Sequence, residues 1–249
     1  MMNLLAEAFA WIFSPERLGG SAPLPAAIGL HMFYTFLSLG IAAVIAVPLG
    51  YYIGHTGRGR NVAIGISGAA RAIPSFGLIL LLVLVIGVTQ KPLAATIAFV
   101  LLGIPSILAG AYAGLEAVDR RVIDAARAVG MTEWQILWRV EVPLGMPLLI
   151  GGLRAGALQI VATVVLAAYV TLGGLGTYII QGIPLRRFDM ILGSAIVIVV
   201  VALVLDGLFA LLERIVVPRG VTAGRPQEVR STSSRRRAVA GIPAEEGRG

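Results

Sequence analysis

The sequence predicts an all-α protein that crosses a membrane several times, and two observations carry this prediction. Only 13% of the 249 residues are charged and 57% are hydrophobic, whereas soluble domains carry about 25% charged residues. Four stretches hold no Asp, Glu, Lys or Arg: 18–57, 72–90, 92–115 and 155–185. These lengths match or exceed the roughly 20 residues that a membrane-spanning helix needs. A water-soluble protein is therefore excluded, and the net charge of +7 does not indicate nucleic-acid binding.

Apolar runs of helical length define five candidate spans, at 27–54, 62–88, 92–113, 147–171 and 190–212. The second contains Pro74, which removes a helical hydrogen bond. We therefore expect either one kinked span or a short helix that leads into a second one.

The spans divide the chain into a transmembrane domain, 27–217, and two flanking segments. In segment 1–26, aromatic residues such as Trp11 precede Ser14-Pro15. This segment is either a short helix at the outer membrane interface or an ordinary lead-in to the first span. Segment 218–249 is basic and poor in aliphatic residues, a composition typical of a disordered tail.

The basic residues predict the orientation, because cytoplasmic loops are enriched in Lys and Arg. With five spans, 16 of the 20 basic residues fall on one side, and only Arg17, Lys91, Arg186 and Arg187 fall on the other. We therefore expect the N-terminus outside, and the loop between the third and fourth spans and the C-terminus in the cytoplasm.

The loop at about 114–146 has the spacing of amphipathic helices rather than of a linker. Apolar residues recur at Val118, Val122, Ala125, Ala126 and Val129, and Gly130 then interrupts the pattern. Glycine commonly ends a helix because it tolerates the left-handed conformation. Thr132 with Gln135 forms a capping-box pattern that starts a second helix, which we expect Pro143 and Pro147 to end. The pair of helices either docks into a partner's groove or covers the base of the bundle.

This loop resembles the EAA motif of binding-protein-dependent ABC importer permeases. The family motif reads Glu-Ala-Ala, three residues, Gly, nine residues, Ile, any residue, Leu, Pro, and the spacing here matches throughout. The matching residues are Asp124, Ala125, Ala126, Gly130, Val140, Val142 and Pro143. The resemblance implies that the segment is a coupling helix that contacts a cytoplasmic ATPase. One helix would then pack against the next through Asp124, Ala125 and Ala126, and Gly130 would form the turn between the two helices.

Further segments are similar to the osmoprotectant permeases, which handle glycine betaine, choline, carnitine and proline betaine. They include Ala72-Ile73-Pro74-Ser75, Gly152-Leu153-Arg154-Ala155 and Gly173-Gly174-Leu175-Gly176. The methionine-importer permeases are similar in outline, so another small solute such as an amino acid is the alternative substrate. Within these segments, Pro74, Ser75, Gly173, Gly174 and Gly176 are candidates for the pathway or its gate.

The resemblance also implies the partners and the location of the protein. It predicts a multi-pass protein of a bacterial or archaeal cytoplasmic membrane that pairs with a second permease, as a homodimer or a heterodimer. A separate ATPase subunit would use ATP and magnesium, and an external binding protein would deliver the substrate. The chain itself would be a non-catalytic subunit in the lipid bilayer, with no cofactor, metal or nucleic acid bound.

Three charged residues lie inside predicted spans, where charges mark candidate functional sites: Arg71, Arg154 and Asp206. All lie near the cytoplasmic ends, where long side chains reach the interface, so we expect structural roles. A stand-alone secondary carrier would need intramembrane ionisable pairs or paired discontinuous helices, and the sequence indicates neither.

An intramembrane protease is suggested by Gly65-Ile66-Ser67-Gly68, but a serine nucleophile needs a base on a later helix. The two histidines, His31 and His55, both precede Ser67, and we expect them at the membrane interfaces. The Gly-rich segment 173–176 lacks the lysine of a phosphate-binding loop. Neither motif supports an enzyme.

Overall fold

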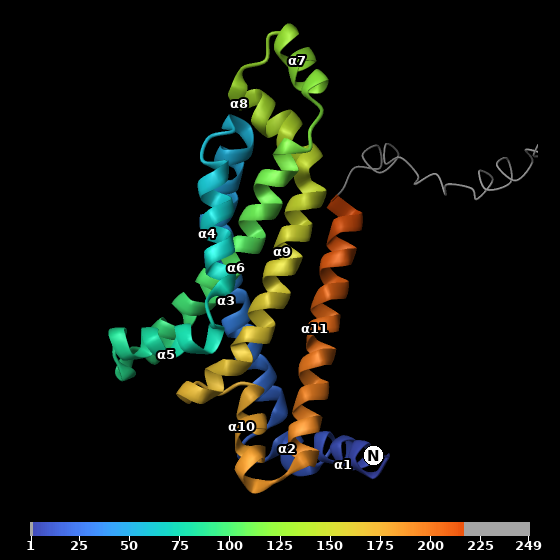
Figure 1. The fold of residues 1–249 in the computed structure, drawn as a ribbon. Helices are drawn as coiled ribbons and strands as arrows, with labels where there is room; N and C mark the ends of the chain where they lie inside the picture. The colour runs from blue at the N-terminus through green and yellow to red at the C-terminus, as the bar shows by residue number, and fades with distance from the viewer. Residues whose placement is uncertain (1, 217–249) are drawn as a thin grey trace, which may run out of the picture. The chain divides into compact units, whose positions relative to one another are not determined.

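The computed structural model describes residues 2–216, and every regular element in that range is helical. Four helical runs are long and apolar enough to cross a membrane: Leu24–Thr56, Val88–Glu116, Glu133–Val170 and Phe188–Val216. Their long helices α3 (Leu24–Thr56), α6 (Lys91–Glu116), α9 (Val142–Val164) and α11 (Phe188–Val216) run side by side (Figure 1). The fold class predicted from the sequence is confirmed, with α3, α6 and α11 close to the predicted spans.

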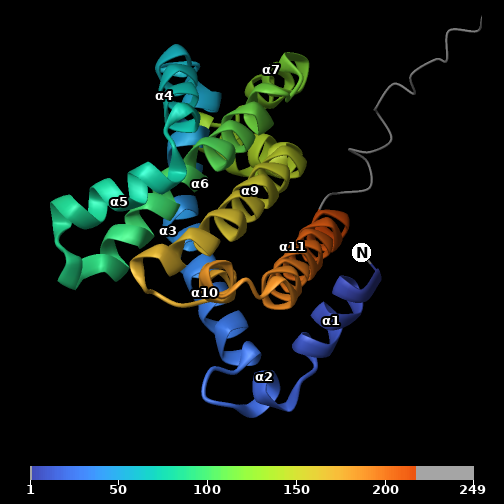
Figure 2. The ribbon, with the colours of Figure 1, turned by 60° about the horizontal axis from the view of Figure 1, so that its bottom comes forward.

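The second predicted span is two helices, α4 (Arg60–Ala72) and α5 (Ser75–Ile86), which are bent by 91° at Ile73–Pro74. Counted together, they raise the number of candidate spans from four to five. The structure thus has the second of the two predicted forms, a helix that leads into another. Helix α5 projects sideways from the bundle (Figure 1) and can be followed again in Figure 2.

The prediction that Pro143 and Pro147 end the loop helix is wrong, because helix α8 (Glu133–Ile136) continues into α9 without a break. A π-helical turn, Leu137–Glu141, lies between them. Pro143 follows this turn almost directly, and the wider turn relieves the clash of its ring with a preceding carbonyl. The fourth helical run therefore begins at Glu133 rather than at 147.

Short helices complete both ends of the bundle (Figures 1 and 2). Helix α7 (Arg120–Ala128) and α8 form one end, and α1 (Met2–Ile12), α2 (Pro15–Gly19) and α10 (Gly176–Leu185) form the other. The sequence analysis did not predict α10. Helix α1 packs against α11, where Trp11 lies over Gly193. The predicted tail, 218–249, lies outside the described residues.

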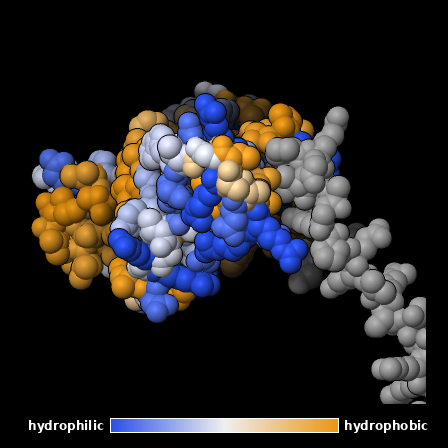
Figure 3. Space-filling view, turned by 90° about the horizontal axis from the view of Figure 1, so that it is seen from above, coloured by the Kyte–Doolittle hydropathy of each residue, from blue (hydrophilic) through white to orange (hydrophobic). Residues whose placement is uncertain are grey.

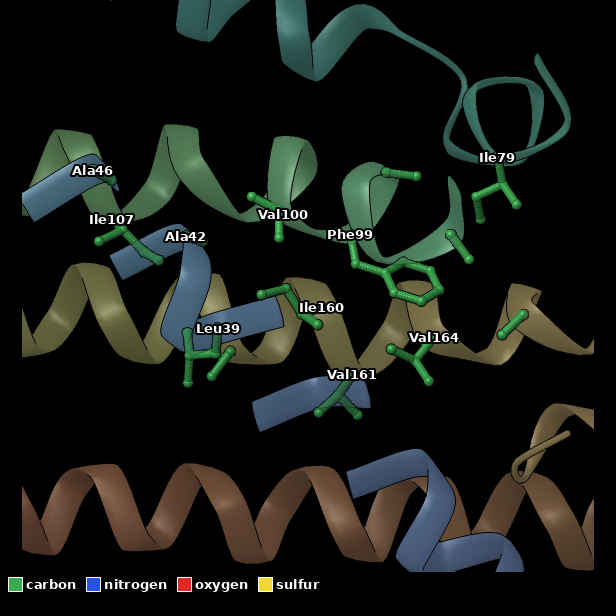
Figure 4. Close-up of a cluster of buried hydrophobic side chains, with 14 of the residues drawn as sticks. Leu39, Ala42, Ala46, Ile79, Phe99, Val100, Ile107, Ile160, Val161 and Val164 are labelled. Carbon is green, nitrogen blue, oxygen red and sulfur yellow. The ribbon is translucent and has the colours of Figure 1, made fainter. Parts of the chain in front are cut away.

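The main core lies where α3, α6 and α9 meet (Figure 4). Its fully buried members include Phe99 and Ile107 of α6 and Ile160 of α9. Beyond this core, α6 and α9 approach so closely that their backbones touch at Gly110–Gly152 and Gly114–Gly145. A Cβ on Gly110 would lie 2.6 Å from the Cα of Gly152. Small residues at such crossings let membrane helices pack through their backbones, which leaves this contact no room for larger side chains.

Candidate functional site

The EAA-like loop, at about 114–146, forms a helix–turn–helix at one end of the bundle. The sequence predicted its first helix, its turn and the start of its second helix, but not where the second helix ends. Asp119 caps α7 by accepting a hydrogen bond from the Arg121 N–H (2.9 Å). Gly130 has a φ of +85°, and the Met131 N–H donates to the Ala126 carbonyl across this turn (3.1 Å). Thr132 and Gln135 then form the predicted capping box. A left-handed residue after the helix closes its carbonyl end in this way, so Gly130 sets the angle between α7 and α8.

The EAA-like residues do not all pack between the helices as expected. Ala126 is buried in a small cluster with Ile123, Ile136 and Val118, and Val140 packs against it. Asp124 and Ala125 are instead exposed, because the helical period places them on a different face of α7. The expectation that Asp124 and Ala125 pack one helix against the next is therefore wrong, while that for Ala126 is confirmed.

One face of α7 carries exposed apolar residues. Val122 is 43% exposed, Val129 is 79% exposed, and Ala125 lies between them on the same face. Their spacing of three and four residues aligns them along one helix stripe. Figure 3 looks onto this end of the molecule, where hydrophilic residues gather in the middle and hydrophobic ones along the sides. Helix α7 therefore both covers the base of the bundle and presents an unpartnered apolar stripe.

Ionic contacts hold α7 to α8 and both to the bundle. Arg127 donates two hydrogen bonds to Glu133 (2.8 and 3.1 Å), on the far side of the Gly130 turn. These bonds and the charge of Glu133 raise the pKa of the Arg127 guanidinium. His55, in the last turn of α3, donates to the nearly buried Glu141 of the π-helical turn. Motion of the loop is thus linked to both α3 and α9.

A polar cavity of about 450 Å³ lies at the break between α4 and α5. Residues from α4, α5, α6 and α9 line it, with polar groups from Arg71, Ser75, Ser106 and Gln159. The N-terminal end of α5, at Ser75, opens here, and such an end carries partial positive charge. Among residues 2–216, Arg71 has no carboxylate within salt-bridge distance. The cavity therefore offers positive charge and hydroxyl groups inside a membrane-spanning bundle.

The predicted pathway residues fall in two places. Ser75 lines the cavity and Pro74 precedes it as the cap of α5. Gly173 and Gly174, with φ of +83° and +80°, form the turn after α9 and pack against Leu30 and His31 of α3. Gly176 begins α10 against the carbonyl of Val165. The structure thus associates only Pro74 and Ser75 with the cavity.

The three charged residues inside the predicted spans also have different surroundings. Arg154 of α9 donates two hydrogen bonds of 2.5 Å to Asp206 of α11, which fits the structural role expected for both. Arg71 instead lines the cavity, a placement that its nearness to Pro74 could have indicated.

The two histidines differ in burial, which the sequence did not predict. His31 is fully buried, and its Nε2 donates to the Val161 carbonyl (3.1 Å), because α9 and the turn at Gly174 cover it. His55 is largely buried against Glu141. Among residues 2–216, no group of three His, Asp or Glu side chains is placed to hold a metal ion.

The bundle, with four described helical runs long and apolar enough to cross a membrane, is that of a multi-pass membrane protein. The family model for the inner membrane component of binding-protein-dependent transport systems matches residues 46–220. The chain belongs to this family and is a non-catalytic permease subunit of an ABC importer.

Its relatives include several permeases named for osmoprotectants. The chain is 28% identical to the glycine betaine/carnitine/choline transport system permease OpuCB of Bacillus subtilis, over 78% of this chain and 88% of that protein. It is 31% identical to the carnitine transport permease OpuCB of Listeria monocytogenes, over 78% and 88%. It is 32% identical to the osmoprotectant import permease OsmW of Salmonella typhimurium, over 77% and 90%.

The fold is similar to that of solved ABC importers. An inward-facing structure of the MetNI methionine transporter gives a TM-score of 0.68 at 20% identity, covering 78% of this chain and 96% of that one. An amino acid ABC transporter with histidines gives 0.57 at 20% identity, over 77% and 92%. At this identity the likeness establishes the fold and says nothing of the substrate.

Proposed function

We propose that this permease imports a quaternary-ammonium osmolyte such as glycine betaine, choline or carnitine. The observation that carries the proposal is its similarity, over more than three quarters of the chain, to permeases named for these compounds. The segment Ala72–Ser75, which resembles the same group, forms the break between α4 and α5 beside the polar cavity. An amino acid as substrate has only the shared fold in its favour.

The EAA-like loop is the proposed docking site for the ATPase subunit that binds ATP and magnesium. Three features support it: the match of Asp124, Ala125, Ala126, Gly130, Val140, Val142 and Pro143 to the family motif, the exposed stripe Val122–Ala125–Val129, and the link through Arg127 and His55 to the bundle. An amphipathic helix with a free apolar stripe suits a groove in a partner. A second permease, identical or related, would complete the pathway, and an external binding protein would deliver the osmolyte.

The polar cavity is the proposed part of the pathway in this subunit. Glycine betaine and carnitine carry a carboxylate, which Arg71 and the N-terminal end of α5 would attract. Ser75, Ser106 and Gln159 offer further hydrogen bonds. A cation without a carboxylate, such as choline, would be repelled by Arg71 and would have to pass through the cavity without its help.

The proposed orientation has the N-terminus outside and the loop 114–146 in the cytoplasm. The basic residues support it: the α7 end of the bundle holds Arg58, Arg60, Arg120, Arg121, Arg127 and Arg139, whereas the α10 end holds Arg17, Arg186 and Arg187. The excess of Arg at the α7 end follows the charge rule for cytoplasmic loops.

Uptake measured in cells tests the proposed substrate. The chain would be produced with its ATPase and binding protein in a bacterium that lacks its own osmolyte importers. We expect uptake of labelled glycine betaine, carnitine or choline that disappears when this chain is omitted. Uptake of methionine without any of the three quaternary ammonium compounds would contradict the proposal.

A further inference from the structure

A second cavity lies beside the EAA-like loop, and two tyrosines and two tryptophans line it together with His55, Glu133 and the aliphatic or hydroxyl side chains of Val47, Pro48, Thr56 and Leu137. It measures about 410 Å³, within the roughly 300–1,000 Å³ of small-molecule pockets, and lies between the end of α3 and the start of α8. We call it the aromatic pocket and define it by six residues: Tyr51, Tyr52, His55, Glu133, Trp134 and Trp138. It is separate from the polar cavity, with which it shares no lining residue.

The rings of the aromatic pocket meet at steep angles, as the walls of a box do, and are not stacked. Trp138 is central, with its ring centroid 6.3 Å from that of Tyr51 at 86° and 5.6 Å from that of Trp134 at 69°. Aromatic ring faces carry partial negative charge. Rings set at steep angles around one space can present faces to it, and quaternary ammonium groups are bound by aromatic cages built from such faces.

The charged groups around the aromatic pocket also favour a cation. Glu133 lines it, and Glu141 lies behind His55, which contacts both carboxylates. Arg127, paired with Glu133, supplies the one opposing guanidinium in this cluster. This cluster thus holds two carboxylates and one guanidinium, with His55 between the carboxylates. A quaternary ammonium ion has no N–H to donate and spreads its charge over methyl groups, so apolar aromatic walls with a nearby negative charge suit it.

We propose that the aromatic pocket binds a quaternary ammonium ion from the side of the membrane that carries the EAA-like loop. The choice of this ligand rests on the proposed function, since it is the chemical group shared by the proposed substrates. The pocket would then sense the transported osmolyte after its release. Because Glu133 also holds Arg127 across the Gly130 turn, an occupied pocket would fix α7 and α8 against α3 and slow further uptake.

Tryptophan fluorescence measures binding directly, because two of the three tryptophans of the chain, Trp134 and Trp138, line the pocket. The third is removed by Trp11→Phe in the full-length chain. The protein is placed in discs of phosphatidylethanolamine and phosphatidylglycerol, which contain no choline headgroup, and titrated with tetramethylammonium, choline or glycine betaine. The neutral choline analogue 3,3-dimethylbutanol and sodium chloride serve as controls. We expect a saturable change in emission at millimolar concentrations with the quaternary ammonium compounds alone.

A matched pair of variants tests the role of the rings. Tyr52 is 56% exposed, so both Tyr52→Phe and Tyr52→Leu are compatible with the fold. Tyr52→Phe keeps a ring face and should change the dissociation constant less than about twofold, whereas Tyr52→Leu should weaken binding at least about threefold. In vesicles holding the assembled importer, tetramethylammonium on the loop side should slow uptake in wild type and less so in Tyr52→Leu.

Three results would overturn the inference. Equal effects of 3,3-dimethylbutanol would make the pocket a general apolar groove, and a response to phosphatidylcholine discs without one to free tetramethylammonium would make it a lipid site. Loss of inhibition in the assembled importer, with binding intact in the isolated chain, would place the pocket under the ATPase.

If binding fails while osmolyte uptake is normal, the proposed function stands without this site. If binding occurs but no quaternary ammonium compound is imported, the proposed function fails instead.

Discussion

At the scale of single residues, the charge of the polar cavity comes from one arginine, Arg71. An arginine in a span costs free energy, about 2.5–3.5 kcal/mol at the bilayer centre on insertion scales, unless it has a partner or water. Arg154 has Asp206 as its partner, whereas Arg71 faces a cavity with hydroxyl and amide groups. The different surroundings of these two arginines separate a structural ion pair from a group available to a substrate.

Replacing Arg71 should therefore discriminate between substrates by their carboxylate. In Arg71→Gln, the maximal uptake rate of glycine betaine and carnitine should fall about tenfold, as expected for the loss of a charge-assisted hydrogen bond of about 1.5 kcal/mol. Choline, which has no carboxylate, should be affected less than about twofold. Arg154→Gln is the control, and it should affect all three substrates alike through the loss of its pair with Asp206. An equal loss for all three substrates in Arg71→Gln would remove Arg71 from the pathway.

At the scale of helices, the sequence predicted most elements and missed those that depend on contacts in space. Charge-free runs located α3 and α6, an apolar run with the single charge of Asp206 located α11, and Gly130 with Thr132 located the turn between α7 and α8. The continuation of α8 into α9 was missed because Pro143 reads as a helix end, and only the π-helical turn before it shows otherwise. The exposure of Asp124 and the burial of His31 were missed because they depend on which face of each helix meets the bundle.

Only those parts of the candidate site that lie within a single sequence motif could be predicted. The residues of the EAA-like segment predicted the turn at Gly130, and Pro74 predicted the helix break. Ser106 and Gln159 lie on other helices, carry no motif and reach the cavity only through the packing of α6 and α9. The aromatic pocket likewise joins residues about 80 positions apart in sequence.

The packing of α6 on α9 can be tested with two neighbouring glycines. A Cβ on Gly152 would lie 2.8 Å from the Cα of Gly110, whereas one on Gly151 meets nothing within 4 Å. Gly152→Ala should destabilise the protein by about 1–3 kcal/mol through overpacking, and Gly151→Ala should be neutral or slightly stabilising because Ala favours helices. Thermal unfolding in detergent measures both. Equal unfolding temperatures for the two variants would show that this crossing is not tightly packed.

At the scale of the whole molecule, the structure assigns different tasks to the two ends and the middle of one bundle. The α7 end carries the EAA-like loop, the middle holds the polar cavity at the α4–α5 break, and the other end gathers α1, α2 and α10 (Figure 1). The helices between the ends are joined by the core of α3, α6 and α9 and by the contacts of His55 and Arg154. We therefore expect a movement imposed on α7 and α8 to reach the helices that line the cavity.

The proposed orientation is simple to test because the sequence contains no cysteine. Single cysteines would be introduced by Ser21→Cys, at the α10 end, and Arg121→Cys, at the α7 end. A thiol reagent that cannot cross the membrane should label Ser21→Cys in intact cells, and Arg121→Cys only after the cells are opened. The reverse labelling would invert the topology and place the EAA-like loop outside.

The most direct test of the central claim, that α7 couples this permease to its ATPase, is the recovery of the ATPase with two variants of adjacent residues. Val129 belongs to the exposed apolar stripe, whereas Ala128, also exposed, lies on another face at the same end of α7. Val129→Asp and Ala128→Asp therefore introduce the same charge with a similar effect on the helix dipole. We expect Val129→Asp to lose at least about tenfold of the co-purified ATPase and of osmolyte-stimulated ATP hydrolysis, in line with about 1.4 kcal/mol of lost apolar contact, and Ala128→Asp to retain both. Normal ATPase binding and hydrolysis in Val129→Asp would contradict the account.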